Sequence, residues 1–201
     1  MRIILGSNSP RRRELLAGLD VEFTVDTGNT FEEIVPDGTP AHEVPSLLSA
    51  GKSHGFHRPL EADELLITSD TVVIVDGHVL GKPHSREQAV DMLRALSGRE
   101  HEVVTAVTIR TPEHEETFSD TTRVSFRELS DGEIDYYIDK YKPFDKAGAY
   151  GIQEWIGYVG ISSITGSFYT VMGFPVHRVW DAIEGALPPT IPRGSRATDS
   201  A

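Results

Sequence analysis

The stretch Arg2-Ile-Ile-Leu-Gly-Ser-Asn-Ser-Pro-Arg-Arg-Arg-Glu-Leu-Leu16 determines how the fold begins. Residues 2–5 predict a short buried strand, and residues 6–9 predict a polar turn. Pro10 suits the first position of a helix, and Ser9 suits its N-cap. A turn that leads from a strand into a helix presents free backbone N–H groups and the positive end of the helix dipole. The stretch therefore predicts a place where an anion can bind.

The distribution of charge supports the same interpretation. The chain carries a net charge of −12, which argues against a nucleic-acid polymer or an anionic membrane surface as a partner. Arg11, Arg12 and Arg13 nevertheless stand together, and no Lys or Arg follows them until Lys52. A basic cluster in an acidic chain favours a small, dense anion, although a solvated helix start is the simpler alternative.

Length and composition restrict the class of protein. The 201 residues suffice for one domain, which we expect over residues 1–187, followed by a disordered tail over residues 188–201. Because the chain has no cysteine, disulfides, thiolate metal sites and cysteine nucleophiles are excluded. Apolar runs are too short for a membrane span, and the first one is too short for a signal peptide. We therefore expect a cytoplasmic protein.

The remaining pattern predicts an α/β fold with several antiparallel strand pairs. Two apolar runs, residues 65–67 and 72–75, are broken by Thr68-Ser-Asp-Thr71, and Asp76-Gly77 is a hairpin signal. Capping boxes begin with Ser85 and Ser130. The other predicted elements are strands at residues 21–25, 101–110, 117–127 and 155–164, and helices at residues 41–56, 86–98, 131–141 and 175–185.

Asp70 is the carboxylate with the most informative surroundings. It lies between two apolar runs, where a charge is costly unless it is paired or bound to a metal ion. The alternative is a residue that caps a turn at the end of a strand. Taken singly, Glu33, Lys52 and Lys82 are typical of solvated surface charges.

Residues 145–153, Asp-Lys-Ala-Gly-Ala-Tyr-Gly-Ile-Gln, form a second informative stretch. Its small residues permit close approach of the backbone to a ligand. Gln153 carries one donor group and one acceptor group, which suit the edge of a base. A glycine-rich connection without a ligand is the alternative. Elsewhere, no standard phosphate loop, nucleophile elbow or zinc-binding helix motif occurs, and His54 and His57 are interpreted as a surface pair.

Five segments together resemble the Maf family of nucleotide pyrophosphatases, in that family's order and spacing from residue 3 to about residue 185. They are Ser7-Asn-Ser-Pro-Arg-Arg-Arg-Glu-Leu-Leu16, Ser69-Asp-Thr-Val-Val73, Gly81-Lys-Pro83, Asp145-Lys-Ala-Gly-Ala-Tyr-Gly-Ile-Gln153, and Gly166-Ser with Val171-Met-Gly-Phe-Pro175. The resemblance implies hydrolysis of a nucleoside triphosphate to monophosphate and pyrophosphate, with Mg²⁺ or Mn²⁺. It implies a long, bent mixed β-sheet with flanking helices and two lobes around a cleft, as in inosine triphosphatase-type enzymes, and a homodimer.

The resemblance and the charge pattern agree on how the triphosphate is bound. The helix N-terminus and four side chains are expected to cradle it, and two lysines are expected to neutralise the leaving pyrophosphate. The four cradle residues are Ser7, Ser9, Arg11 and Arg12, and the lysines are Lys52 and Lys82.

Asp70 and Glu33 are expected to hold the metal ion and to orient or deprotonate the attacking water. Arg11, Thr71 and Gln153 match the part of the family that acts on dTTP and UTP. Whether water attacks the α or the β phosphorus stays open.

Two segments depart from the family pattern. Asp26-Thr-Gly-Asn-Thr-Phe-Glu-Glu33 stands where Asp-x-Asp-Glu is common, so the match at Glu33 is weaker. Ala50-Gly51-Lys52-Ser53 stands where Glu-Lys-Ala is common, which keeps Lys52 but places it in a poorer helix.

Two other functions compete with hydrolysis. A non-catalytic nucleotide-binding regulator of cell division would not need Asp70 together with both lysines. A nucleotidyltransferase would need a site for a second substrate, of which the sequence gives no sign.

Overall fold

The strand that carries Asp70, β3 (Glu64–Val75), lies inside a seven-stranded mixed sheet in the computed structural model, which describes residues 1–185. The predicted tail at residues 188–201 lies outside these residues. The strand order is β2-β1-β3-β5-β6-β7, and β4 also pairs with β3. The other strands are β1 (Arg2–Leu5), β2 (Phe23–Val25), β4 (His78–Leu80), β5 (Glu100–Arg110), β6 (Glu115–Phe126) and β7 (Ile161–Thr165).

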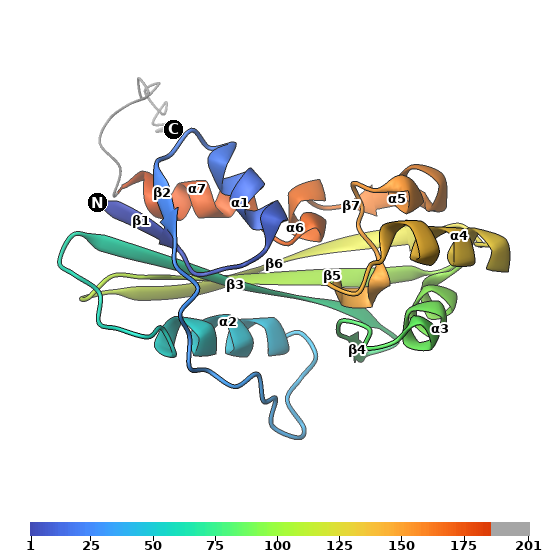
Figure 1. The fold of residues 1–201 in the computed structure, drawn as a ribbon, viewed down its shortest axis with the longest axis horizontal. Helices are drawn as coiled ribbons and strands as arrows, with labels where there is room; N and C mark the ends of the chain where they lie inside the picture. Colours follow the sequence, from blue (N-terminus) through green and yellow to red (C-terminus); the bar gives the residue numbers. More distant parts are fainter. Residues whose placement is uncertain (186–201) are drawn as a thin grey trace, which may run out of the picture.

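The helices cover both faces of this sheet and its end far from the N-terminus (Figure 1). Helix α2 lies on one face, whereas α1, α6 and α7 lie on the opposite face. The helices are α1 (Pro10–Ala17), α2 (Val44–His54), α3 (Arg86–Leu96), α4 (Asp131–Tyr141), α5 (Trp155–Gly160), α6 (Phe168–Met172) and α7 (Val176–Glu184), with the short 3₁₀ helix η1 (Ala147–Ala149). The mixed sheet with flanking helices confirms the predicted fold class.

Strand β3 is continuous through residues 68–71, so the alternative in which Asp70 caps a turn at the end of a strand is wrong. Its ladder with β5 runs without interruption from Leu66–Arg110 to Ile74–Glu102 and includes the pair Asp70–Ala106. Backbone pairing thus holds the polar residues in the strand although their side chains interrupt the apolar pattern.

The other edge of β3 is only partly paired, and the unpaired part lies next to Asp70. The parallel partner β1 reaches Ile67 of β3, and the antiparallel partner β4 begins at Val73. Between them, residues 68–72 face no strand on this edge. The turn that leaves β1 therefore lies beside Asp70.

Side chains along β3 alternate between the two faces of the sheet. Val73 and Val75 join the main hydrophobic core, while Val72 and Ile74 pack in a second cluster with Val44 and Leu48 of α2. By the same alternation, Asp70 shares the face of α2, and Thr71 shares the face of α1 and α6.

Local sequence signals explain most element boundaries. Ser9 caps α1 by accepting from the Arg12 N–H, and Ser130 and Glu133 form the predicted capping box of α4. Asp76 and Gly77 both have positive φ, as the predicted hairpin requires.

Three local predictions need correction. Residues 155–160 form helix α5 rather than the start of a strand, and only residues 161–165 pair with β6. Helix α6 was not predicted, because its five residues are too few to show a periodicity. Ser85 caps α3, but Gln88 accepts from the His84 N–H rather than completing a capping box.

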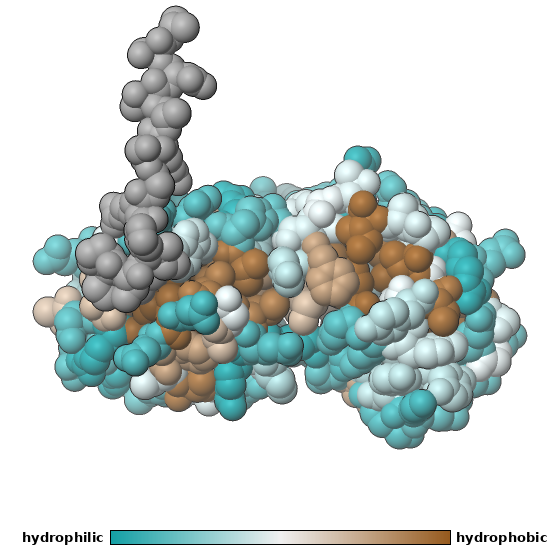
Figure 2. Space-filling model, turned by 90° about the horizontal axis from the view of Figure 1, so that it is seen from above, coloured by the Kyte–Doolittle hydropathy of each residue, from teal (hydrophilic) through white to brown (hydrophobic). Residues whose placement is uncertain are grey.

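From above, the molecule narrows between two larger parts (Figure 2). On this face, hydrophobic residues gather over α5, β7 and α6. In residues 1–185, no helix combines the length and the apolar character needed to cross a membrane.

Candidate active site

All ten predicted site residues line two adjoining pockets at the unpaired edge of β3. One pocket contains Asp70, Thr71 and Gln153, and the other contains Ser7 and Glu33. The remaining five line both pockets, namely Ser9, Arg11, Arg12, Lys52 and Lys82. The structure therefore brings together residues that lie as far apart in the sequence as Ser7 and Gln153.

The turn between β1 and α1 forms one wall of these pockets. The Ser7 hydroxyl accepts a hydrogen bond from the Ser9 N–H at 3.2 Å, and Ser7 is buried. Ser9 then caps α1, so the turn enters the helix in the extended conformation that its N-cap requires. This arrangement gives the wall the positive end of the α1 dipole.

Arg12 is held by protein groups on three elements. Its guanidinium donates to the carbonyl oxygens of Ser69 at 2.8 Å and Gly173 at 2.9 Å, to the Ser7 hydroxyl at 3.3 Å and to the Thr71 hydroxyl at 3.2 Å. Burial lowers the pKa of Arg12 below its ordinary value, whereas the nearby charge of Asp70 raises it. Arg12 therefore ties α1 to β3 and to the turn after α6.

Arg11 makes a different set of contacts from its neighbour. Its Nη1 forms an ion pair with Asp145 Oδ2 at 2.9 Å, and its side chain is 21% exposed. Asp145 Oδ1 also pairs with Lys146 Nζ at 2.7 Å. Burial raises the pKa of Asp145, but hydrogen bonds from Lys146 and Arg11 outweigh this and lower it. Arg11 remains open to a ligand on the pocket side.

Lys52 joins the two predicted metal-binding carboxylates. Its Nζ lies 2.6 Å from Asp70 Oδ1 and 2.9 Å from Glu33 Oε1. Burial raises the pKa of Glu33, but the hydrogen bond from Lys52 and the charges of Lys52, Lys82 and Arg12 lower it overall. Glu33 is therefore ionised at neutral pH and lies beside Asp70.

Lys82 contributes a positive charge without an ion pair. No carboxylate of residues 1–185 lies within 4.0 Å of its ammonium group, although it lines both pockets. It follows β4, and the adjacent Gly81 carbonyl accepts from the Gly148 N–H at 3.0 Å. An incoming anion can thus bind Lys82 without breaking an existing salt bridge.

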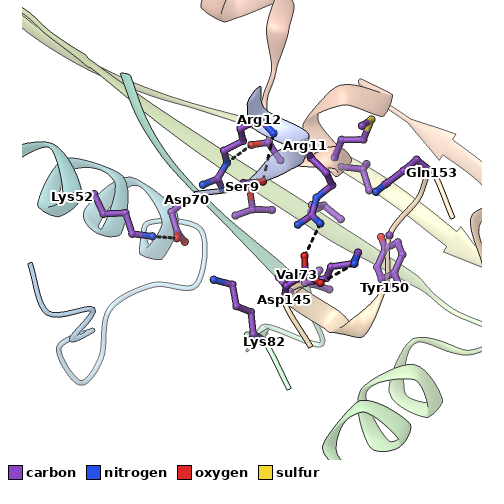
Figure 3. Close-up of a pocket in the computed structure, with 18 residues that line it drawn as sticks. Ser9, Arg11, Arg12, Lys52, Asp70, Val73, Lys82, Asp145, Tyr150 and Gln153 are labelled. Carbon is purple, nitrogen blue, oxygen red and sulfur yellow. Dashed lines mark hydrogen bonds and ion pairs between the residues drawn. The ribbon is translucent and has the colours of Figure 1, made fainter. Parts of the chain in front are cut away.

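The far end of the pocket combines apolar walls with one amide. Gln153 and Tyr150 lie on the opposite side of Arg11 from Lys52 and Asp70 (Figure 3). Val73, Val171 and Met172 line the same pocket. Gln153 Oε1 is buried and has no hydrogen-bond partner within the described residues. A buried acceptor without a partner costs free energy that a ligand donor can recover.

The carboxylate pair fits a hard divalent cation that arrives with a phosphate. Within residues 1–185, no cluster of three or more His, Asp or Glu side chains has the arrangement of a metal site. Mg²⁺ commonly binds one or two carboxylates and completes its shell with water and substrate phosphate oxygens. Glu33 and Asp70 suit such a cation, and Mn²⁺ by the same oxygen chemistry. His54 and His57 instead pair with Glu115 and Asp26.

Sequence reasoning missed the residues that support the Gln153 end of the pocket. Lys146 also pairs with Glu154 Oε1 at 3.1 Å, and the Tyr137 hydroxyl donates to Glu154. That hydroxyl in turn accepts from the Gly151 N–H at 3.0 Å. Only Lys146 and Gly151 lie in a stretch that the sequence singled out, and no short-range pattern connects them to Tyr137.

Fold and site together define a mixed α/β protein with a basic cleft and a carboxylate pair at an unpaired strand edge. A family model described as Maf-like protein matches residues 2–186, and the chain belongs to the Maf family.

Curated relatives are about half identical to the chain. Proteins named dTTP/UTP pyrophosphatase from Phocaeicola vulgatus and Bacteroides thetaiotaomicron are each 49% identical over 183 residues, which cover 91% of this chain and 95% of theirs. One from Porphyromonas gingivalis is 50% identical over 185 residues, covering 91% of this chain and 93% of its own.

Proposed function

We propose that this protein hydrolyses nucleoside triphosphates, dTTP and UTP above all, to the monophosphate and pyrophosphate. The names of its half-identical relatives support this substrate class. The observation that carries the proposal is the position of Asp70. Its carboxylate lies on the unpaired edge of β3, 2.6 Å from Lys52 and within a pocket lined by Arg11, Arg12 and Lys82.

The basic side chains and the turn before α1 suit a triphosphate. Ser7, Ser9 and the helix N-terminus offer hydroxyl and backbone donors, and Arg11 offers a guanidinium on the open side of the pocket. Lys52 and Lys82 supply positive charge where pyrophosphate would leave. A triphosphate would take the place of the carboxylate partners of Arg11 and Lys52.

Asp70 is the proposed acceptor of the proton from water. Lys52 contacts Oδ1, which leaves Oδ2 to orient a water molecule toward the phosphate chain. As the water oxygen bonds to phosphorus, its proton passes to Asp70, and the bond between the α and β phosphates breaks. Attack at either of these phosphorus atoms gives the same two products.

Glu33 and Asp70 would together hold Mg²⁺ or Mn²⁺. When bound, such a cation neutralises phosphate charge and lowers the pKa of a coordinated water. Lys52 bridges the two carboxylates and would move toward the phosphates when the cation binds.

Gln153 is the proposed reader of the base. Uracil and thymine carry an N3–H donor flanked by two carbonyl acceptors, and the unpartnered Gln153 Oε1 can accept from that donor. The amide NH₂ can donate to a flanking carbonyl. Thr71 stays a predicted contributor, because its hydroxyl lies in the same pocket and accepts from Arg12.

Measuring pyrophosphate release from a nucleotide panel tests the proposal and separates its rivals. We expect release from dTTP and UTP that needs a divalent cation and no acceptor molecule. Binding without release would instead indicate a regulator. Release that requires an acceptor would indicate a nucleotidyltransferase.

Two further predictions concern assembly and location, the first from the family resemblance and the second from the short apolar runs of the sequence. We propose a homodimer, which sedimentation equilibrium of the purified chain measures directly; a single species of monomer mass would contradict it. The expected cytoplasmic location remains a prediction for fractionation of cells.

A further inference from the structure

Three glycines bring the segment before Glu33 against helix α2. A Cβ on Gly51 would lie 2.2 to 2.8 Å from three ring atoms of Phe31, and a Cβ on Gly55 would lie 2.6 Å from Phe31 Cβ and from Asn29 Oδ1. A Cβ on Gly28 would lie 2.3 Å from the His57 ring. A Cβ at Gly51 or Gly55 would overlap these atoms, so Asn29 and Phe31 pack directly on the backbone at this end of α2, and Gly28 packs on His57 just beyond it. Figure 1 shows the segment after β2 passing this end of the helix.

Hydrogen bonds also join the segment of residues 28–31 to Lys52 in α2 and to Gly55, which follows the helix. The Asn29 side chain donates to the carbonyl oxygen of Lys52 at 2.5 Å and accepts from the Phe31 N–H at 2.7 Å. The Thr30 N–H donates to the Gly55 carbonyl at 2.8 Å. The last carbonyl groups of a helix have no partner within the helix. Asn29 donates a hydrogen bond to one of them, the carbonyl of Lys52.

Phe31 is the hydrophobic anchor of the segment. Its ring is partly buried against the second hydrophobic cluster, which contains Leu48 of α2 and Val72 of β3. Glu33 follows two residues later, is largely exposed, and reaches Lys52 Nζ at 2.9 Å. Apart from this ion pair, the place of Glu33 depends on how firmly Phe31 is held.

We propose that Phe31 and Gly51 are positioning residues, which through their contact hold the Glu33 carboxylate beside Lys52 and Asp70. The proposal rests on the proposed function, in which Glu33 and Asp70 share a divalent cation. Glycine is less favourable than alanine inside a helix. At position 51 it is required because the Phe31 ring occupies the place of a Cβ. The two places where the chain departs from the family pattern are therefore in contact with each other.

The first test uses alanine at Gly51 with a matched glycine control. Gly51→Ala would force the Phe31 ring away, whereas Gly132→Ala in α4 adds a Cβ that meets no atom within 4 Å. We expect Gly51→Ala alone to accelerate hydrogen–deuterium exchange at the Thr30 and Phe31 amides. Exchange equal to that of Gly132→Ala would overturn the proposal.

The second test replaces Phe31 by a residue without a ring, which makes room for a Cβ at position 51. The ring atoms that the Gly51 Cβ would meet are Cζ, Cε1 and Cε2, and leucine has none of them. Gly51→Ala combined with Phe31→Leu should therefore exchange more slowly at these amides than Gly51→Ala alone. A double variant no better protected than Gly51→Ala would show that the contact does not hold the segment. Phe31→Leu alone, with a smaller anchor, gives the same readout where Gly51→Ala fails to fold.

The third readout connects the contact to the cation. We expect the Mg²⁺ concentration for half-maximal pyrophosphate release to rise about ten- to hundredfold in Gly51→Ala, the usual effect of losing support around a metal ligand. The rate at saturating Mg²⁺ should change much less, and the double variant should recover. An unchanged Mg²⁺ response in Gly51→Ala overturns the role of the contact.

Failure of this inference and failure of the proposed function give different results. If the wild-type chain releases no pyrophosphate, the function is wrong, but the exchange experiments still test whether Phe31 and Gly51 hold the segment. If the wild type is active and Gly51→Ala matches Gly132→Ala in every readout, the function stands and the positioning role is wrong.

Discussion

Three consecutive arginines at the start of α1 have three different environments. Arg12 is inside a network of four hydrogen bonds, Arg11 makes one ion pair at the pocket wall, and Arg13 is exposed. The charge pattern predicted a basic cluster, and the family resemblance selected Arg11 and Arg12, but neither distinguished the roles of these two. The environment of each arginine depends on which side of the first turn of α1 faces the unpaired edge of β3.

This difference predicts three outcomes for alanine substitutions. Arg12→Ala removes four hydrogen bonds, among them the one to the carbonyl of the buried Ser69, at a cost of about 1–3 kcal/mol, so it should lower both the melting temperature and the activity. Arg11→Ala should lower activity about tenfold or more, because a charge-assisted hydrogen bond to the substrate is lost. Its melting temperature should change little. Arg13→Ala is the matched control and should change neither. Calorimetry and steady-state rates measure both effects; equal melting temperatures for Arg11→Ala and Arg12→Ala would contradict the account.

Asp70→Asn tests the proposed base most directly among single residues. Asparagine keeps the shape and the strand position, but it cannot accept the proton from water. We expect turnover to fall by about a hundredfold or more, with the fold retained. Asp91→Asn on the exposed side of α3 is the control and should be as active as the wild type. Near-normal turnover of a folded Asp70→Asn variant would remove Asp70 from the mechanism.

At the scale of elements, the sequence predicted the types of most helices and strands but not how they meet. The alternation and caps are local signals, and they placed β1, α1, β5, β6 and α4 within a few residues. The polar residues of β3 left open whether a strand ends there, because the ladder between β3 and β5 is a long-range feature. The unpaired edge itself arises because β1 ends where β4 has not begun, and no short-range pattern encodes that.

The turn between α6 and α7 is a second element whose geometry serves the site. Gly173 adopts φ of 101°, and its carbonyl accepts from Arg12. Alanine there is strained by about 1–2 kcal/mol, and its Cβ would lie 3.1 Å from the Thr71 hydroxyl. We expect Gly173→Ala to lower both stability and activity.

Gly77→Ala is the control for backbone strain. Gly77 also has a positive φ, of 76°, but a Cβ there meets no atom within 4 Å. It should lose stability by a similar amount and keep its activity per folded molecule. If the two variants lose activity equally in the folded state, Gly173 is not part of the site's framework.

At the scale of the whole molecule, the fold brings basic side chains together in one cleft of a chain whose net charge is negative. Thr71 and Arg12 reach the unpaired edge from one face of the sheet, and Asp70 and Lys52 reach it from the other. The resemblance to the Maf family predicted which residues meet, whereas composition alone predicted only a small anion.

Stability of the whole domain should depend on pH through His101. Burial lowers its pKa to about 4 from 6.5, its Nε2 bonds the Tyr150 hydroxyl at 2.8 Å, and its buried Nδ1 has no partner among residues 1–185. Between about pH 6.5 and pH 4 the unfolded chain binds a proton here that the folded chain does not. The free energy of unfolding therefore falls as the pH falls through this window, by at most about 3 kcal/mol from this group.

His101→Gln isolates that contribution. Glutamine can still bond Tyr150 but does not titrate, so its unfolding free energy should fall less steeply over the same pH range than that of the wild type. Chemical denaturation at several pH values measures both slopes. Parallel curves for the two proteins would show that His101 does not govern the acid response.

The central claim is that the cleft hydrolyses pyrimidine nucleoside triphosphates with Gln153 as the reader of the base. The decisive measurement is kcat/KM for pyrophosphate release from dTTP, UTP, dCTP, dATP, GTP and 7-methyl-GTP, for the wild type, Gln153→Glu and the control Gln88→Glu. A mismatched buried hydrogen bond costs about 1–3 kcal/mol, which permits tenfold or greater discrimination. The account predicts that dTTP and UTP exceed the others by that factor, and that only Gln153→Glu reduces the preference. A wild type that prefers a purine such as 7-methyl-GTP, or a ranking that Gln153→Glu leaves unchanged, would contradict it.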